Sequence, residues 1–191
     1  MANYCWNRAH ITGPKETLDI IEERFKKYHD MKDFTFTEFS RMVLGFDPEV
    51  VPEHETNDEL FSRIYRYGTK WWDFDIERGD DWMNIIGDSA WSPPIGLLTM
   101  MTKVFDVKIE GEYSESGCDF GGFYTMENGE CEDNEMTYFE YELESDRDNA
   151  IGRLIDDINN DCIDFDFAEE NYKQHLTNEE WNEILTETNN I

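Results

Sequence analysis

Residues 67–94 read YGTKWWDFDIERGDDWMNIIGDSAWSPP, and this stretch decides the fold. It holds four of the six tryptophans of the chain, Trp71, Trp72, Trp82 and Trp91. Strand-forming residues at 71–76 and 82–91 flank the turn sequence Arg-Gly-Asp-Asp at 78–81, so we expect a β-hairpin. Trp is large and its ring N–H needs a partner when buried. The cluster therefore marks either a dense core or an aromatic binding surface.

Strands and helices alternate on both sides of this hairpin. Residues 3–12 predict a strand, and apolar residues then recur at helical spacing, at Leu18, Ile21, Phe25 and Tyr28. After the hairpin we expect Ser92 to cap a helix, followed by a strand at 107–113. The order strand, helix, strand, strand, helix, strand matches a split β-α-β plan. The expected class is α+β, a ferredoxin-like antiparallel sheet with helices on one face and an acidic C-terminal α/β extension.

The remaining segments complete this plan. We expect residues 30–56 to form a long, partly extended loop, and Asn57 to cap a helix that ends near Tyr67. Strands are expected at 120–126 and 136–143 around a turn at 127–135, and another at 162–167. Helices are expected near 146–158 and 178–187. These elements suggest a ferredoxin-like core at 1–126 and an acidic extension at 127–191, packed together as one compact domain.

Charge restricts the partners of the chain. Asp and Glu number 45 against 16 Lys and Arg, a net charge of −29, and residues 127–191 hold 21 acidic and only three basic residues. Nucleic acids and anionic membranes need basic surfaces, so direct binding of either is disfavoured. The natural complement is a basic protein surface.

Targeting and metal-binding patterns are not visible in the sequence. No run of 18 apolar residues and no signal-peptide pattern occurs, so we expect a protein of the host-cell cytoplasm. The four cysteines form no CxxC pair and the four histidines show no metal spacing, which favours free thiols and neither a metal nor a cofactor. A Ser-His-Asp arrangement and a phosphate-binding glycine loop are also missing, and the chain is expected to be non-catalytic.

Four segments resemble the YubB ferredoxin-like domain family of bacteriophages, prophages and conjugative plasmids. They are MANYCWNRAHITG at 1–13, YGTKWWDFD at 67–75, SAWSPPIGLL at 89–98 and EYSESGCDFGGFY at 112–124. The resemblance covers residues 1–126 and implies a ferredoxin-like fold and a mobile-element origin. It implies no established activity, cofactor or catalytic residue.

The acidic extension is the first candidate site. Its segment MTYFEYELE at 136–144 predicts a strand with Glu140, Glu142 and Glu144 on one face, about 6–7 Å apart, comparable to phosphates along a nucleic-acid strand. Further carboxylates follow at Asp156, Asp157, Asp164 and Asp166. Such a surface could imitate DNA and mask the basic, nucleic-acid-binding surface of a host or defence protein. A solvated acidic surface without a particular partner is the alternative interpretation.

A second hypothesis is a small-ligand site or enzyme pocket. Its residues would be Lys70, Trp91, Ser92 and Asp119, because Ser92 begins a helix and glycines beside Asp119 permit close approach of a ligand. A structural cap with Trp91 as a packing residue is the alternative, and we expect most of Trp71, Trp82 and Trp91 to be buried. A structural or virion component is a third possibility.

Overall fold

The computed structural model describes residues 3–30, 35–46 and 66–188. The chain divides into two compact units. The N-terminal unit comprises Met1–Cys118 and Gly122–Glu135, and the C-terminal unit comprises Asp119–Gly121 and Met136–Ile191. The expected boundary at 126/127 would cut through a β-hairpin of the sheet. The chain passes from one unit to the other after Glu135 instead.

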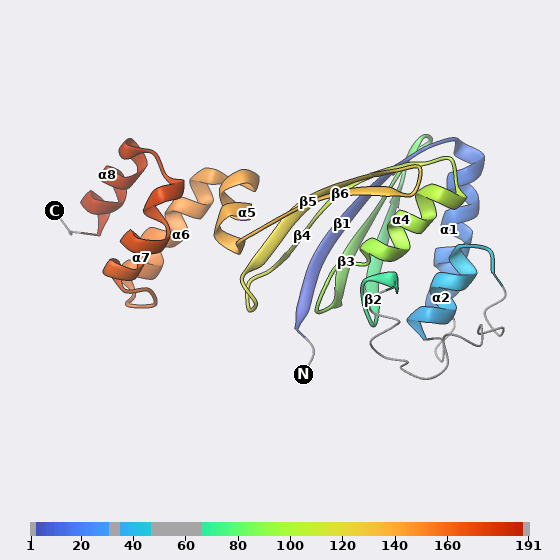
Figure 1. Cartoon of the computed structure of the whole chain (residues 1–191), viewed down its shortest axis with the longest axis horizontal. Coiled ribbons are helices and arrows are strands. Elements are labelled where there is room, and N and C mark those ends of the chain that lie inside the picture. Colours follow the sequence, from blue (N-terminus) through green and yellow to red (C-terminus); the bar gives the residue numbers. More distant parts are fainter. Residues whose placement is uncertain (1–2, 31–34, 47–65, 189–191) are drawn as a thin grey trace. The chain divides into compact units, whose positions relative to one another are not determined.

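The N-terminal unit is a six-stranded sheet with helices (Figure 1). Its elements are β1 (Tyr4–Thr12), α1 (Lys15–Asp30), α2 (Phe36–Val43), β2 (Trp72–Arg78), β3 (Trp82–Ala90), α4 (Ile95–Val104), β4 (Lys108–Glu115), β5 (Phe120–Glu127) and β6 (Glu130–Met136). The strand order is β2-β3-β1-β4-β5-β6, and β1 pairs antiparallel with both β3 and β4. The predicted ferredoxin-like α+β class is confirmed, and β5 and β6 extend the sheet beyond the four-strand plan.

One face of the sheet is covered and forms the core. Along β1, Cys5, Ala9 and Ile11 are fully buried, and their neighbours in sequence point to the opposite face. Trp72 and Phe74 share the covered face, with ring centroids 6.0 and 5.2 Å from that of Phe25 in α1. Trp72 and Phe74 therefore point to the same side of the sheet, as alternate residues of a strand do.

The expected burial of the other hairpin tryptophans is wrong. Trp71 and Trp82 are half-buried, and Trp91 is 39% exposed. Alternation along β2 turns Trp71 away from the face that buries Trp72. Trp91 follows the end of β3 and has a φ of 67°, a left-handed backbone that bulky side chains rarely adopt. Of the four tryptophans in this segment, Trp72 is therefore the one that is fully buried.

Two other expectations for the N-terminal unit need correction. Helix α2 lies inside the segment expected to be an extended loop, and a capping box between Thr35 and Glu38 begins it. Ser92 does not cap α4, whose N-cap is Pro94; the Ser92 hydroxyl donates instead to the Gly68 carbonyl. The helix expected to begin after Asn57 lies outside the described residues, except for its last two positions.

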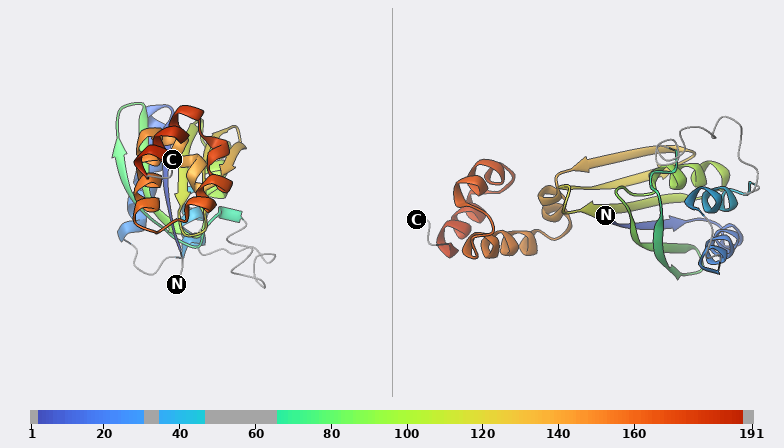
Figure 2. Two further views of the ribbon diagram at one scale, coloured as in Figure 1. Left: turned by 90° about the vertical axis from the view of Figure 1, so that its left-hand side faces the viewer. Right: turned by 90° about the horizontal axis from the view of Figure 1, so that it is seen from below.

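The C-terminal unit is helical. Its elements are α5 (Tyr138–Ser145), α6 (Arg147–Asn159), α7 (Phe165–Asn171), the 3₁₀ turn η2 (Lys173–His175) and α8 (Asn178–Glu187). A separate apolar cluster holds them together: Phe139, Leu143, Ala150, Ile151, Leu154, Ile158, Ala168, Trp181 and Ile184. Figure 2 shows these helices from two further sides. The strands expected at 136–143 and 162–167 are wrong, because Thr137 and Asp164 cap the helices α5 and α7 there.

Candidate functional site

The carboxylates of the C-terminal unit greatly outnumber its cations. Residues 136–191 contain 16 Asp and Glu but only Arg147, Arg153 and Lys173 as Lys or Arg. Each of these cations already has a carboxylate partner: Arg147 lies 2.5 Å from Glu180, Lys173 lies 2.7 Å from Glu169, and Arg153 pairs with Glu142. The other 13 carboxylates have no Lys or Arg partner among the described residues of this unit.

Two of the predicted site residues stabilise α5. Glu140 closes a capping box, accepting from the Thr137 backbone N–H at 3.0 Å, and lies 3.2 Å from His175. The hydrogen bond from the Thr137 hydroxyl is the main reason why the pKa of Glu140 falls below its usual value. Glu142 is buried and pairs with Arg153. The expected single face with Glu144 does not exist, because residues two apart on a helix point in different directions.

Asp164 and Glu180 also have structural contacts. The Asp164 carboxylate caps α7 and accepts from the Asp166 backbone N–H at 2.9 Å. Glu180 accepts from Arg147, and this hydrogen bond is the largest cause that lowers the pKa of Glu180 to about 2. Glu180 also accepts from the Thr177 N–H at 2.6 Å, which caps α8. These acids hold the helices in place.

A second group of carboxylates faces solvent. Of the predicted residues, Glu144, Asp156 and Asp166 are exposed and Asp157 is half-buried. Glu144 lies in the last turn of α5, and Asp156 and Asp157 lie in the last turn of α6. Neither turn carries a basic residue. Negative charge at the C-terminal end of a helix opposes the helix dipole, so these three positions disfavour folding.

The residues of the alternative pocket are divided between the units. Lys70, Trp91 and Ser92 belong to the N-terminal unit, and Asp119 belongs to the C-terminal unit. The Lys70 Nζ lies 5.9 Å from the centroid of the Trp91 ring, a cation–π contact on the surface. Asp119 has a φ of 55° and accepts from the Tyr138 backbone N–H at 3.2 Å. Asp119 thus fixes the entry to α5.

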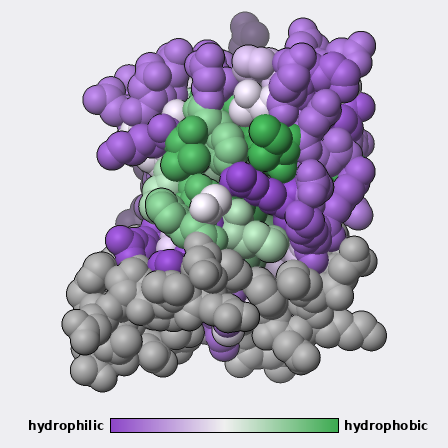
Figure 3. All heavy atoms as spheres, turned by 90° about the vertical axis from the view of Figure 1, so that its right-hand side faces the viewer, coloured by the Kyte–Doolittle hydropathy of each residue, from purple (hydrophilic) through white to green (hydrophobic). Residues whose placement is uncertain are grey.

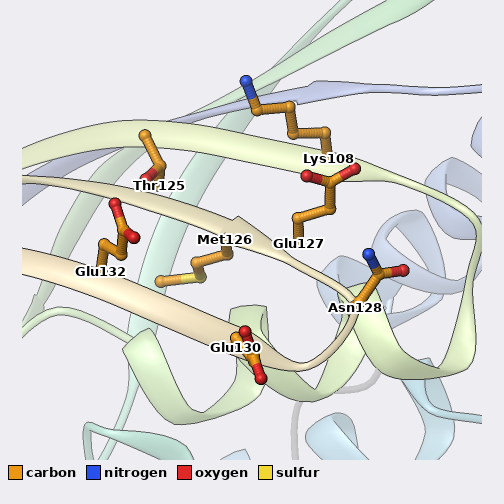
Figure 4. Close-up of a pocket in the computed structure, with 7 residues that line it drawn as sticks. All are labelled: Lys108, Thr125, Met126, Glu127, Asn128, Glu130 and Glu132. Carbon is orange, nitrogen blue, oxygen red and sulfur yellow. The ribbon is translucent and has the colours of Figure 1, made fainter.

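The described residues of the N-terminal unit line at least two recesses. One, of about 310 Å³, is lined by Lys108, Thr125, Met126, Glu127, Asn128, Glu130 and Glu132 (Figure 4). Its only cation, Lys108, already lies 2.5 Å from Glu110, which raises the pKa of Lys108 and lowers that of Glu110. The other recess, of about 290 Å³, is lined by Arg8, His10, Glu110, Gly111, Glu112 and Phe123. Within the described ranges, no cluster of His, Cys, Asp or Glu could hold a metal ion.

Exposed apolar side chains occur on two faces of the N-terminal unit. Figure 3 shows a hydrophobic area bordered by hydrophilic residues, on the side where α1 and α2 lie in Figure 1. Among the exposed apolar residues of this unit are Phe46, which follows α2, and Val104 at the end of α4. The uncovered face of the sheet carries Tyr4 and Trp6. The period-2 alternation of residues 4–12 could have revealed this aromatic row in the sequence.

Part of the chain is similar to known proteins. Residues 71–154 match the family described as the ferredoxin-like domain in Api92-like protein. A crystal structure of a protein api92 from Yersinia pseudotuberculosis aligns with 72% of this chain and 98% of that one, at 12% identity and a TM-score of 0.45. No curated protein matches the chain. In the part of the chain that the structure describes, no helix has the length and apolarity needed to cross a bilayer.

Proposed function

We propose that this chain is a non-catalytic protein that binds a basic surface of another protein through the exposed carboxylates of its C-terminal unit. The observation that carries the proposal is the position of Glu144, Asp156 and Asp157. They lie in the last turns of α5 and α6, where they oppose the helix dipole and have no ion-pair partner among the described residues. Negative charge at these positions costs folding stability. Its presence is explained if a basic partner neutralises it on binding.

The helices of the C-terminal unit hold these carboxylates in fixed positions. The capping Thr137, Asp146, Asp164 and Thr177 fix where the helices begin, and the apolar cluster around Leu154 and Trp181 packs them together. Helical residues three or four apart have Cβ atoms about 5–6 Å from each other. Glu179 and Glu183, both exposed on α8, have this spacing, which approaches that of phosphates along one nucleic-acid strand, whereas Asp156 and Asp157 are adjacent on α6 and Glu144 lies on α5.

The biological part of the proposal is competitive masking. A folded acidic surface that occupies a nucleic-acid-binding groove excludes DNA or RNA from it, and long-range attraction accelerates the encounter. A host or defence protein in the cytoplasm is the partner class that fits a phage- or plasmid-encoded origin. That origin is supported by the resemblance of residues 1–126 to mobile-element proteins.

A capture experiment with two matched variants tests the function. The full chain is immobilised, incubated with bacterial lysate, washed at rising salt and eluted with duplex DNA. The test variant is E144Q/D156N/D157N, and the control variant D80N/D106N/E132Q removes the same charge from exposed positions of the N-terminal unit. We expect the wild type and the control to retain a nucleic-acid-binding protein that DNA elutes, and the test variant to lose it.

Two results would contradict the proposal. Equal retention by the test variant would mean that these carboxylates do not bind the partner. Captured proteins that duplex DNA fails to displace would exclude masking of a nucleic-acid site. In the second case a small-ligand function involving Lys70 and Trp91 becomes the better candidate, because their cation–π contact lies on an exposed surface.

A further inference from the structure

The uncovered face of the sheet carries a compact group of aromatic and acidic side chains. It consists of Tyr4, Trp6, Trp71, Asp73 and Asp88, which we call the aromatic–acidic patch. Tyr4 is 63% exposed and Trp6 is 36% exposed, although both lie on β1, a central strand of the sheet. Such large aromatic side chains on an open surface are uncommon without a binding role, since their burial gives much of the energy of protein interfaces.

The strand register brings the members of this patch together. Trp6 lies directly opposite Asp88 of β3, and Asp88 lies directly opposite Asp73 of β2. Tyr4 pairs with Ala90, and its ring centroid is 5.3 Å from that of Trp71, edge to face. Ala90 is fully buried beside them. The patch is therefore a continuous surface across three neighbouring strands.

The two carboxylates of the patch are an unfavourable pair. Residues directly opposite on antiparallel strands have Cβ atoms about 4.5–5.5 Å apart, and like charges there destabilise the sheet. Within the described part of the chain, neither Asp73 nor Asp88 receives a hydrogen bond or ion pair at its side chain. Arg8, the next residue of β1 on this face, lies 3.9 Å from Glu112 on the other side of the strand. A cation from outside would relieve this repulsion.

We propose that the aromatic–acidic patch binds an arginine side chain of a partner protein segment. Charge complementarity requires a cation, and the partly exposed indole of Trp6 is an aromatic ring of the type that attracts cations. Arginine suits both features, because its planar guanidinium stacks on aromatic rings and donates to carboxylates through several N–H groups. This surface is separate from the carboxylates of the C-terminal unit, and it can bind whether or not those carboxylates do.

Defined peptides test this site without the natural partner. The ¹⁵N-labelled full chain is titrated with acetyl-Gly-Arg-Gly-Arg-Gly-amide, and the indole N–H signal of Trp6 is followed by NMR. The same peptide with citrulline, a neutral isostere of arginine, is the ligand control. We expect a saturable shift of the Trp6 signal with arginine and none with citrulline.

Matched variants then assign the binding to the patch. Trp6→Leu should weaken binding of the arginine peptide roughly two- to fivefold, as expected for loss of a cation–π contact at an exposed site. Trp82→Leu removes a half-buried tryptophan at the start of β3 that is remote from the patch, and it should leave the affinity unchanged. D73N/D88N should also weaken binding, whereas D80N/D106N should not. The variant E144Q/D156N/D157N should bind the peptide as the wild type does, which separates this site from the proposed function.

Three results would overturn the inference. They are unchanged affinity in both Trp6→Leu and D73N/D88N, equal binding of the citrulline peptide, and shifts confined to the C-terminal unit. A single-stranded oligonucleotide that shifts the Trp6 signal more strongly than the peptide would assign the face to base stacking instead. Thermal unfolding checks that both variants are folded: Trp6→Leu should still melt cooperatively, and D73N/D88N should melt at or above the wild-type temperature, because it removes the like-charge repulsion.

Discussion

At the scale of single residues, the hairpin tryptophans differ in what they contribute. Trp72 is 1% exposed and packs against Phe25 and Phe74, whereas Trp91 is 39% exposed and has a left-handed backbone. Two tryptophans of one hairpin thus have different structural roles. Trp72 is buried because its position in β2 points it to the covered face of the sheet, whereas Trp91 lies beyond the end of β3.

Substitution of these two residues should therefore have unequal effects. Trp72→Ala removes a fully buried ring and should lower the free energy of unfolding by about 3–5 kcal/mol. Trp91→Ala should lower it by less, about 1–2 kcal/mol, because 39% of the Trp91 side chain is already exposed. Urea unfolding monitored by circular dichroism measures both. Equal losses in the two variants would show that Trp91 supports the fold in a way that its exposure does not indicate.

At the scale of secondary-structure elements, α5 shows why alternation alone is insufficient. In MTYFEYELE, aromatic or apolar residues alternate with acids as on a half-buried strand, and that pattern suggested a strand. Thr137 and Glu140, three residues apart, carried the opposite signal of a capping box, which forms in the structure. The same spacing precedes α2 at Thr35 and α8 at Thr177. The capping-box spacing therefore indicates α2 and α5, which hydrophobic periodicity missed, as well as α8, which was expected.

The cap of α5 can be tested by two substitutions at one position. Thr137→Ala removes the side-chain acceptor of the Glu140 N–H and should destabilise the C-terminal unit by about 1 kcal/mol. Thr137→Ser keeps the hydroxyl and should retain most of the stability. Thermal unfolding of the three proteins under one condition gives the comparison. A Thr137→Ala protein as stable as the wild type would argue against this helix start.

At the scale of the whole molecule, the sequence predicted the sheet better than it predicted the charged unit. Strands β1 to β5 and helices α1 and α4 follow from hydrophobic periods and turn signals, whereas α2 and β6 do not, and the split β-α-β order left one arrangement of the first four strands. The candidate site was harder to predict from the sequence, because the many carboxylates look alike there. The sequence does not show which of them form ion pairs or helix caps within the protein. Only three-dimensional partners distinguish Glu142, paired with Arg153, from Glu144, which faces solvent.

The uncompensated charge should make stability depend on salt. E144Q/D156N/D157N removes repulsion and unfavourable dipole contacts, so it should raise the stability at low salt by roughly 1 kcal/mol, about 2–4 °C in melting temperature. The gain should shrink near 0.5 M salt, where the Debye length is only a few ångströms (about 3 Å at 1 M). Thermal unfolding of the variant and of D80N/D106N/E132Q at two salt concentrations measures this. A variant less stable than the wild type at low salt would show that these carboxylates stabilise the fold.

The outermost strands of the sheet, β2 and β6, share one further property. β2 exposes Asp73, Asp75 and Glu77, and β6 exposes Glu130, Glu132, Asp133 and Glu135. A free strand edge is a template for pairing with another chain, and charge along it is a common protection. Two copies that approached edge to edge would bring rows of carboxylates against each other. The acidity of this chain therefore also guards its sheet against growth into aggregates.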